Sequence, residues 1–316
     1  MQTHSSFTLE EALKLTLTCA EQAAYGTVSI NGFRGNLTTF IKWCKGKGII
    51  DIQDVDLDLL KTYFMFLKEQ QLSGYTIKAR KRSLNYLFDC LVKKEIVAEN
   101  PFNHLRIKLQ LTNKVWDVLT LNEMGVLLEG AEKKHQHASS IQKTTTFRNK
   151  LILKLLLSTG MRSCELSALK VKDVNLEENT LHIRGKGSNW YIKRNRIAFI
   201  DEKHLAYELS TLCTGAQPDD YLFTTNIGGR LKESSVYVII KKLGLFAGLK
   251  KNVTPHLLRH SFCTFLIGQG ADAFSVQRLM GHWQVQTTLK FYLHLTPQEV
   301  EDDWRKFSPL AGGELS

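Results

Sequence analysis

The stretch from Thr180 to Ile200, TLHIRGKGSNWYIKRNRIAFI, differs in texture from the helical sequence around it. Apolar and polar residues alternate at its two ends, and Gly185-Lys186-Gly187 follows the first alternating run. Alternation with a period of two is typical of a strand, and glycine favours the backbone angles of tight turns. We therefore expect a β-hairpin that turns at Gly185-Lys186-Gly187.

Signals that begin and end helices dominate the first hundred residues. Thr8 with Glu11 makes a capping box, which opens an amphipathic run. The last such run begins after Ser73-Gly74 and is ended by Asn100-Pro101. Residues 1–105 are therefore expected to form an all-α bundle. Its two middle helices are expected over 32–44 and 57–67.

The helix expected after Gly74 has two different faces. Apolar residues recur at spacings of three, four or seven, which is typical of a helix side that packs into a core. Basic residues occupy the other side and are candidates for contacts with DNA phosphates, although a solvated helix face has the same composition. The apolar positions are Ile77, Leu84, Phe88 and Leu91, and the basic ones are Lys78, Lys81 and Arg82.

A change of character separates the bundle from the rest of the chain. Residues 106–118, RIKLQLTNKVWDV, show no clean period and are expected to form a linker. Thr120 with Glu123 then makes a second capping box, and an apolar helix from Phe147 to Ser158 is expected to stop near Gly160. Helices are expected to resume from Ser234. The predicted fold is mainly α with a small β-sheet, in two domains.

Composition favours a polyanionic partner. The 316 residues carry 42 Lys and Arg against 31 Asp and Glu, a formal net charge of +11. That excess indicates nucleic acid first and an acidic membrane surface second. The six cysteines form no CxxC pair, and no secretory signal precedes them, so reduced thiols in a cytosolic compartment are expected. No apolar run long enough to span a membrane appears.

The stretch TPHLLRH, Thr254 to His260, suits a phosphate. Thr254 is a good N-cap and Pro255 fits the first helical position, so His256 lies in the first turn with Arg259 on the same side. Backbone N–H groups, an imidazole and a guanidinium would then converge. The plainer alternative is a surface helix start that holds two cations.

A metal site is the third interpretation of this helix. His256, His260 and Cys263 are spaced at i, i+4 and i+7, which zinc ligands also use. The sequence supplies no HExxH glutamate and no CxxC pair, so helix packing is the favoured role for His260 and Cys263. No metal is expected.

Two further cations stand at junctions between elements. In STGMRSCEL, Ser158 to Leu166, Arg162 follows Gly160 and precedes Glu165 by three residues, a spacing at which the carboxylate can orient the guanidinium. A local ion pair on the surface is the alternative. Lys186 at the hairpin turn is either a proton donor on a mobile loop or ordinary turn chemistry.

Near the C-terminus the chain reads GHWQVQTTLKFYLH, Gly281 to His294. Ser275 is expected to cap a short helix that runs to Met280 and ends at Gly281, immediately before His282. Thr287 or Thr288 is expected to cap another helix that carries Tyr292. In the plainer interpretation the aromatic and leucine side chains of this second helix are packing residues.

Taken together, these motifs resemble the tyrosine recombinase (phage integrase) family. That family has an arginine in a T-G-x-R-x-x-E-L segment, a lysine in a hairpin turn, H-x-x-R, G-H and a tyrosine, in this order across most of residues 117–295. YTIKARKRSLNYLFDCLVKKEIVAENP also resembles the last helix of the family's core DNA-binding domain. The matching residues here are Thr159-Gly160-Met161-Arg162-Ser163-Cys164-Glu165-Leu166, Lys186, His256, Arg259, Gly281-His282 and Tyr292.

One spacing departs from many family members. They place the tyrosine nine positions after the G-H histidine, where this chain has Phe291, whereas others use ten, where it has Tyr292. Phenylalanine has no hydroxyl, so Tyr292 is the expected nucleophile. The longer spacing mildly favours the transposon and phage side of the family, and with it integration or excision of a mobile element, over resolution of chromosome dimers.

The resemblance implies a cofactor-independent phosphoryl transfer. Tyr292 would form a 3′-phosphotyrosyl bond with DNA, and a second 5′ hydroxyl would reverse the attack, without ATP or metal. Lys186 would protonate the leaving 5′ oxygen as general acid. The remaining residues would stabilise the charged phosphoryl oxygens, with Glu165 and His256 in supporting roles: Arg162, Arg259 and His282.

The family also implies an organisation and partners. It assigns residues 1–105 to DNA binding and 119–295 to catalysis, and it implies that a C-terminal segment passes to a neighbouring copy. In the tail 296–316, Val300, Trp304 and Phe307 fall on one helical face, which suits either such a contact or packing back on the same domain. The partner is a double-stranded DNA recombination site, bound as a homotetramer on paired sites, with accessory DNA-bending proteins, in the bacterial cytoplasm at the nucleoid. The alternatives are a tyrosine-class (type IB-like) DNA topoisomerase and a catalytically inactive DNA-binding regulator.

Overall fold

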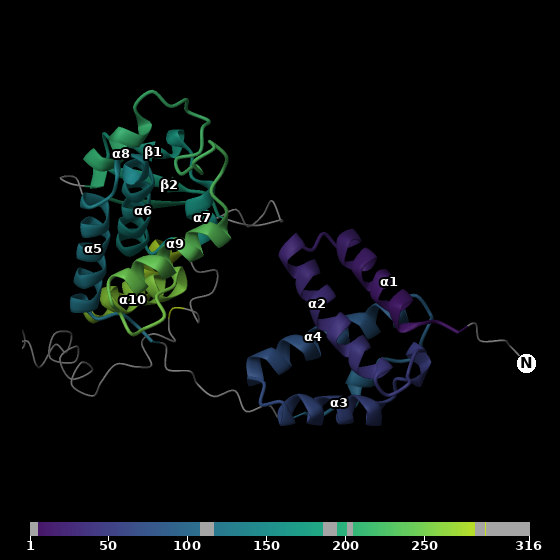
Figure 1. Cartoon of the computed structure of the whole chain (residues 1–316). Helices are drawn as coiled ribbons and strands as arrows, with labels where there is room; N and C mark the ends of the chain where they lie inside the picture. Colours follow the sequence, from purple (N-terminus) through teal and green to yellow (C-terminus); the bar gives the residue numbers. More distant parts are fainter. Residues whose placement is uncertain (1–5, 108–116, 186–194, 201–204, 282–287, 289–316) are drawn as a thin grey trace, which may run out of the picture. The chain divides into compact units, whose positions relative to one another are not determined.

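The computed structural model describes residues 6–107, 117–185, 195–200, 205–281 and 288. The chain divides into two compact units, Met1–Val115 and Trp116–Ser316. The boundary falls inside the stretch 106–118 that the sequence predicts as a linker. Figure 1 shows helices in both units and labels strands only in the second. The mainly helical fold with a small sheet is as predicted.

The first unit is a helical bundle whose ends follow local capping signals. Thr8 accepts a hydrogen bond from the backbone N–H of Glu11, and the Glu11 carboxylate accepts one from the N–H of Thr8 at 2.8 Å, so the predicted capping box is present. Ser73 caps the helix that begins at Gly74. The elements are α1 (Leu9–Gln22), α2 (Thr27–Lys45), η1 (Ile52–Asp54), α3 (Leu57–Glu69), α4 (Gly74–Lys93) and η2 (Pro101–Asn103).

The apolar face of α4 packs into the core of this unit, as its pattern predicts. Ile77, Leu84, Phe88 and Leu91 are all buried there. They share the core with side chains of the neighbouring helices, among them Phe40 of α2 and Phe64 of α3. Burial of large apolar and aromatic side chains is the main source of stability in such a bundle.

The end of α4 differs from the prediction. The helix stops at Lys93, because Glu95 adopts a left-handed backbone with φ of 58°. The N–H groups of Glu95 and Ile96 then donate to the carbonyls of Val92 and Leu91, which closes the helix as a Schellman motif. Asn100 instead caps the short helix η2. Glycine is the usual residue at this position of a helix end. Because a glutamate occupies it here, the sequence does not show that the helix ends at Lys93.

The second unit is built around helix α6. Five of the six residues from 151 to 156 are fully buried, so this part of the helix lies in the core. Neighbouring helices cover it, as Figure 1 shows for α5 and α9. The helices are α5 (Leu121–Gln136), α6 (Ser140–Thr159), α7 (Ser163–Ala168), η3 (Val171–Asp173), α8 (Leu205–Cys213), α9 (Glu233–Phe246), α10 (Pro255–Gly268) and α11 (Ala273–Met280).

A small antiparallel sheet, in the order β1-β2-β3, completes the described part of this unit. The predicted hairpin is confirmed: β2 (Thr180–Ile183) pairs with β3 (Arg196–Phe199). Ile183 lies opposite Arg196, so residues 184–195 connect the strands, and Lys186 and Gly187 of the predicted turn lie outside the described residues. The strand β1 (Val174–Asn175) gave no sequence signal, since two residues are too few to show alternation.

Two helix starts also correct the sequence analysis. Helix α8 precedes Ser234, where helices were expected to resume. Helix α11 is capped by Asp272, whose carboxylate accepts from the N–H groups of Phe274 and Ser275, so Ser275 lies inside the helix. The caps at Thr120 and Thr254 are as predicted. Within the described part of the chain, no helix combines the length and the apolar character needed to cross a membrane.

Candidate active site

Arg162 is positioned by the abrupt end of α6. Gly160 adopts a left-handed backbone with φ of 57°, and the chain turns there into α7, for which Arg162 is the N-cap residue. A side chain at position 160 would strike the ring of Phe262, because a Cβ atom there would lie 2.4 Å from its Cδ1 atom. Glycine is therefore required both for the backbone angle and for the close approach of α10.

Glu165 holds Arg162, as its spacing predicts. Its Oε1 accepts from Arg162 Nη1 and its Oε2 from the Arg162 backbone N–H, both at 2.8 Å. The carboxylate is buried while the Arg162 side chain is 35% exposed, so this is no surface ion pair. Burial raises the pKa of Glu165, but the Arg196 charge and the hydrogen bonds from Arg162 outweigh it and hold the pKa below its usual range.

Arg259 reaches the same place from α10. It is buried, and its guanidinium donates to the carbonyl of Gly160 and, at 2.6 Å, to that of Met280. Burial lowers the pKa of Arg259 to about 9, and the Arg162 charge acts in the same direction. The group stays protonated at neutral pH, and an anion beside it would restore its ordinary pKa.

A third guanidinium, that of Arg196, was missed by the sequence analysis. Arg196 begins β3, and its side chain is 7% exposed. Its Nη2 donates to Glu165 Oε2 at 3.0 Å and its Nη1 to the Leu279 carbonyl at 2.6 Å. The signal that was available is alternation: Ala198 and Ile200 are buried, so Arg196 shares the inward side of its strand.

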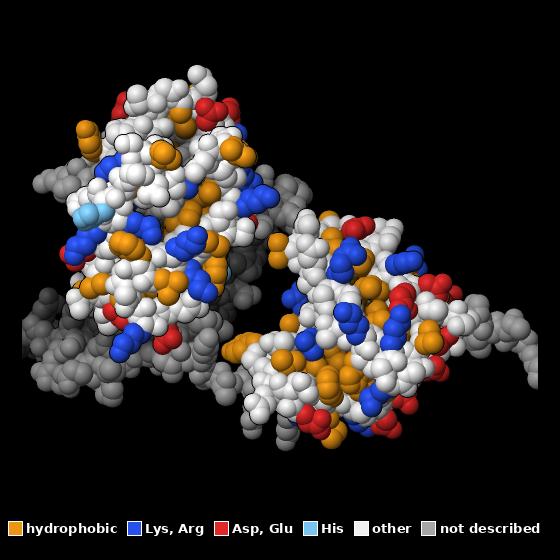
Figure 2. Space-filling model, in the orientation of Figure 1, with side chains coloured by type: hydrophobic (Ala, Val, Ile, Leu, Met, Phe, Trp, Pro, Cys, Tyr) orange, Lys and Arg blue, Asp and Glu red, His pale blue; other side chains and the backbone are white. Residues whose placement is uncertain are grey.

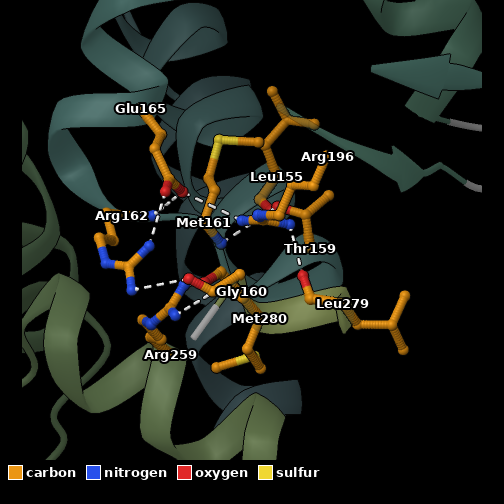
Figure 3. Close-up of polar contacts among 11 residues, drawn as sticks. Leu155, Thr159, Gly160, Met161, Arg162, Glu165, Arg196, Arg259, Leu279 and Met280 are labelled. Atoms are coloured by element: carbon orange, nitrogen blue, oxygen red, sulfur yellow. Dashed lines mark hydrogen bonds and ion pairs between the residues drawn. The ribbon is translucent and has the colours of Figure 1, made fainter. Parts of the chain in front are cut away.

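The three guanidiniums converge on the C-terminal end of α11. Three consecutive carbonyls, which a helix end leaves without intrahelical partners, each accept from a different arginine. The negative end of the helix dipole lies there and favours the cations. Figure 3 shows the three side chains arriving from separate elements, with Arg162 and Arg196 joined to Glu165 and Arg259 beside Gly160 and Met280. The pairs are Leu279 with Arg196, Met280 with Arg259, and Gly281 with Arg162, the last at 3.4 Å.

We call Arg162, Arg196, Arg259 and Glu165 the arginine cluster. The cluster holds three guanidiniums and one carboxylate, which contacts Arg162 and Arg196, so the cluster carries a net positive charge. Two of the arginines are buried and Arg162 is partly exposed, which gives a solvent-side opening to a region of low dielectric. Such a site binds an oxyanion and stabilises negative charge that develops on it.

Of the other predicted catalytic residues, the structure describes only His256. His256 lies in the first turn of α10, one turn before Arg259, and is exposed. Among the described residues, the structure gives it no hydrogen bond to the arginine cluster. Lys186, His282 and Tyr292 lie outside the described residues. Gly281, whose carbonyl accepts from Arg162, is bonded directly to His282 in the sequence.

The predicted DNA-binding residues lie on α4 of the first unit. Lys78 and Arg82 are exposed and Lys81 is half-buried. Figure 2 shows Lys and Arg side chains over much of the visible face of this unit, with Asp and Glu gathered mainly along its edge. This distribution suits contact with a phosphate backbone.

The residues proposed as zinc ligands by spacing do not form a metal site in the described structure. No group of three His, Cys, Asp or Glu side chains that could hold an ion occurs within its described ranges. Burial raises the pKa of Cys263 to about 12, although the Arg259 charge acts in the opposite direction. Cys263 packs in an apolar cluster with Ile267, Val276 and Met280, as expected for a packing residue.

Comparison with known proteins places this geometry in a family. Residues 117–299 match the model of the phage integrase family. The chain is 29% identical over 290 residues to the tyrosine recombinase XerD of Oceanobacillus iheyensis, covering 90% of this chain and 93% of the relative. It is 28% identical over 294 residues to the tyrosine recombinase XerC of Bacillus pumilus, covering 91% and 92%.

Two solved structures are similar over nearly the whole chain. One is the XerH site-specific recombinase bound to its difH substrate, with a TM-score of 0.70, 25% identity and coverage of 93% of this chain and 83% of the other. The other is the Tn1549 transposon integrase in complex with transposon right end DNA, with a TM-score of 0.71, 22% identity and coverage of 94% and 99%. The second likeness shows the fold alone. Nothing in these similarities favours the topoisomerase alternative.

Proposed function

Because the chain belongs to the phage integrase family, it is a DNA strand transferase, and we propose how its residues carry out site-specific recombination. The observation that carries the proposal is the arginine cluster, in which Arg162 and Arg259 present their charges beside one buried carboxylate. Both belong to the segments that resemble the family motifs. A phosphodiester of DNA is the anion that this site binds.

The cluster acts on the phosphoryl oxygens. Attack on a phosphodiester builds negative charge on those oxygens, and fixed guanidiniums stabilise it without having to reorganise. The carbonyls of Gly160 and Met280 hold the buried Arg259 in place, and Glu165 holds Arg162. His282, bonded to the Gly281 that the cluster contacts, adds a third donor in this proposal.

Tyr292 and Lys186 carry out the covalent step. The Tyr292 oxygen forms a bond to phosphorus while the bond from phosphorus to the 5′ oxygen breaks, which leaves a 3′-phosphotyrosyl link. Lys186 gives its proton to the leaving 5′ oxygen, and His256 takes part in moving the phenolic proton. A 5′ hydroxyl of a second strand then attacks the link and releases Tyr292. The phosphodiester energy is conserved, so the cycle consumes no ATP.

DNA binding involves both units in this proposal. Residues 1–105 form a core-binding domain with Lys78, Lys81 and Arg82 on DNA phosphates, residues 106–118 a linker, and residues 119–295 the catalytic domain. The XerH and Tn1549 proteins were solved bound to DNA, which supports a recombination site as the partner here. A homotetramer on paired sites, docked through residues 296–316, accounts for exchange between two duplexes.

The type of element served is also proposed. The ten-residue spacing from His282 to Tyr292 supports integration or excision of a mobile element. Exchange between two labelled duplexes bearing element ends measures this directly. Products that separate one circular dimer into two monomer circles at a chromosomal site would assign resolution instead.

A trapped covalent intermediate tests the proposed function. The substrate is a nicked duplex that carries a sequence the protein selects from a randomised library, so that the short cleaved fragment diffuses away. We expect a protein–DNA adduct that survives denaturation, disappears in Tyr292→Phe and persists in the matched control Phe291→Ala. An adduct that Tyr292→Phe retains would overturn the assignment of the nucleophile.

A further inference from the structure

Arg196 belongs to none of the short motifs that carry the family resemblance, yet its guanidinium is hydrogen-bonded to two parts of the candidate active site. One end of its guanidinium meets Glu165 Oε2 at 3.0 Å, and the other meets the Leu279 carbonyl at 2.6 Å. The planar fork of arginine suits such a bridge, since a lysine offers a single point charge. The side chain thus joins β3 to the partner of Arg162 and to the end of α11.

The shared carboxylate sets the charge that Arg162 can offer. The negative charge of Glu165 is divided between two guanidiniums, so Arg162 is only partly neutralised. Without Arg196, Glu165 would belong to Arg162 alone, and the net positive charge of the cluster would fall by one. An oxyanion bound at Arg162 would then face a neutral pair in place of a cation.

The same side chain limits movement at the end of α11. A Cβ atom at Gly281 would lie 3.0 Å from Cδ and 3.2 Å from Nε of Arg196, so the arginine packs against the backbone there. Gly281 has φ of 61° and ends the helix. Arg196 therefore fixes the chain immediately before His282, in register with the carbonyls that Arg162 and Arg259 contact.

We propose that Arg196 is a positioning residue for DNA strand cleavage. It takes one oxygen of Glu165, which leaves the Arg162 charge available to the scissile phosphate, and it anchors the end of α11 beside that charge. This inference rests on the proposed function, because the reaction it serves is the attack on a DNA phosphodiester.

The test compares single-turnover adduct formation by Arg196→Met with that of the wild-type protein on the nicked duplex described above. We expect the rate at saturating DNA to fall by about 10- to 100-fold, because a misplacement of a catalytic group by about 1 Å can cost about 100-fold in rate. The apparent affinity for the duplex should change little. Arg196→Lys keeps the positive charge and loses the two-pronged guanidinium. Its rate of adduct formation should lie between those of the wild type and Arg196→Met.

A charge-specific rescue separates this role from a structural one. In the double variant Arg196→Met/Glu165→Gln no carboxylate neutralises Arg162. The adduct should therefore form several-fold faster than in Arg196→Met alone. A purely structural arginine gives no such rescue. A double variant as slow as or slower than Arg196→Met, with both proteins folded, would overturn the proposal.

Lys150→Met is the matched control for the loss of a buried cation. The side chain of Lys150 is as buried as that of Arg196 and pairs with Glu132 of α5 and Glu208 of α8, which are not members of the arginine cluster. If Lys150→Met slows adduct formation as much as Arg196→Met at equal thermal stability, Arg196 has no positioning role. Adduct formation by the wild-type protein reports on the proposed function separately, since the Arg196 comparison is made relative to that rate.

Discussion

Two groups of buried charge in the second unit are built on opposite principles. Lys150 lies inside the helical layer and pairs with Glu132 and Glu208, each at 3.0 Å, while Lys154 pairs with Glu208 at 2.7 Å. Two cations there meet two carboxylates. The arginine cluster sets three guanidiniums against Glu165 and uses backbone carbonyls as the remaining acceptors.

The difference shows which group is complete in the protein alone. A buried charge is costly unless it is paired, so the balanced lysine group serves structure. Carbonyls carry only partial charge, and they satisfy the hydrogen bonds of the arginines without neutralising them. The depressed pKa of Arg259, caused by burial first and by the neighbouring Arg162 next, expresses the same excess. In the proposed reaction a DNA phosphate supplies the missing negative charge.

Removing Arg259 should have the largest effect on the reaction. We expect Arg259→Ala to slow adduct formation by about 10²–10³-fold, the loss found when one donor to a developing oxyanion is removed. Single-turnover assays with the nicked duplex measure it. Stability should fall by about 1–3 kcal/mol, because the Gly160 and Met280 carbonyls lose their donor. A folded Arg259→Ala protein that forms adduct at the wild-type rate would show that the arginine cluster, like the lysine group, does not act in the reaction.

Removing Lys150 should lower the stability of the protein and leave the rate of adduct formation unchanged. Lys150→Met leaves Glu132 without its cation and Glu208 with Lys154 alone, and we expect the free energy of unfolding to fall by about 3 kcal/mol, the lower end of the usual range because Glu132 is 41% exposed. Urea denaturation measures this change. Below its melting temperature the variant should form adduct at the wild-type rate. Unchanged stability would show that the lysine group is not structural.

Acid should act on the arginine cluster through Glu165. Its pKa lies below the ordinary value of 4.5, so the carboxylate stabilises the folded state above that pH, and this contribution is lost as the pH falls through the lowered folded-state pKa. We expect Glu165→Gln to flatten the dependence of unfolding free energy on pH below 4.5. Denaturation at neutral and at acidic pH measures this, and equal slopes for both proteins would contradict it.

Surface cations should have the smallest effect, on affinity alone. Lys78→Ala should lower the slope of log K against log salt by about 0.9, as expected for the loss of one phosphate contact. Lys61, paired with Asp58 at 2.8 Å on α3, offers a matched control whose replacement should leave the slope unchanged. Equal slopes for Lys78→Ala and the wild type would remove Lys78 from the DNA contacts.

Features decided within a few residues could be predicted from the sequence. The capping boxes at Thr8 and Thr120, the cap at Thr254 and the glycine ends at Gly160 and Gly281 are all present. Each depends on the local competition for backbone N–H and C=O groups, which a short pattern shows. The pairing of Arg162 with Glu165 is local in the same sense.

Features decided by distant contacts could not. Arg196 is read as a strand residue from its neighbours, and its role appears only when it meets Leu279, 83 positions away. The end of α4 depends on Glu95, a residue with no preference for the left-handed backbone that the tertiary structure imposes on it. Asp272 and Ser275 are both good N-caps, and the sequence does not choose between them.

The identity of the residue that carries the DNA tests the central claim most directly. Trypsin cleaves after Lys290 and Arg305 and releases residues 291–305, in which Tyr292 is the only tyrosine. Mass spectrometry of the trapped adduct, after nuclease digestion, should find the nucleotide mass on this peptide and assign it to Tyr292. A nucleotide on any other peptide, or on another side chain of this one, would contradict the account.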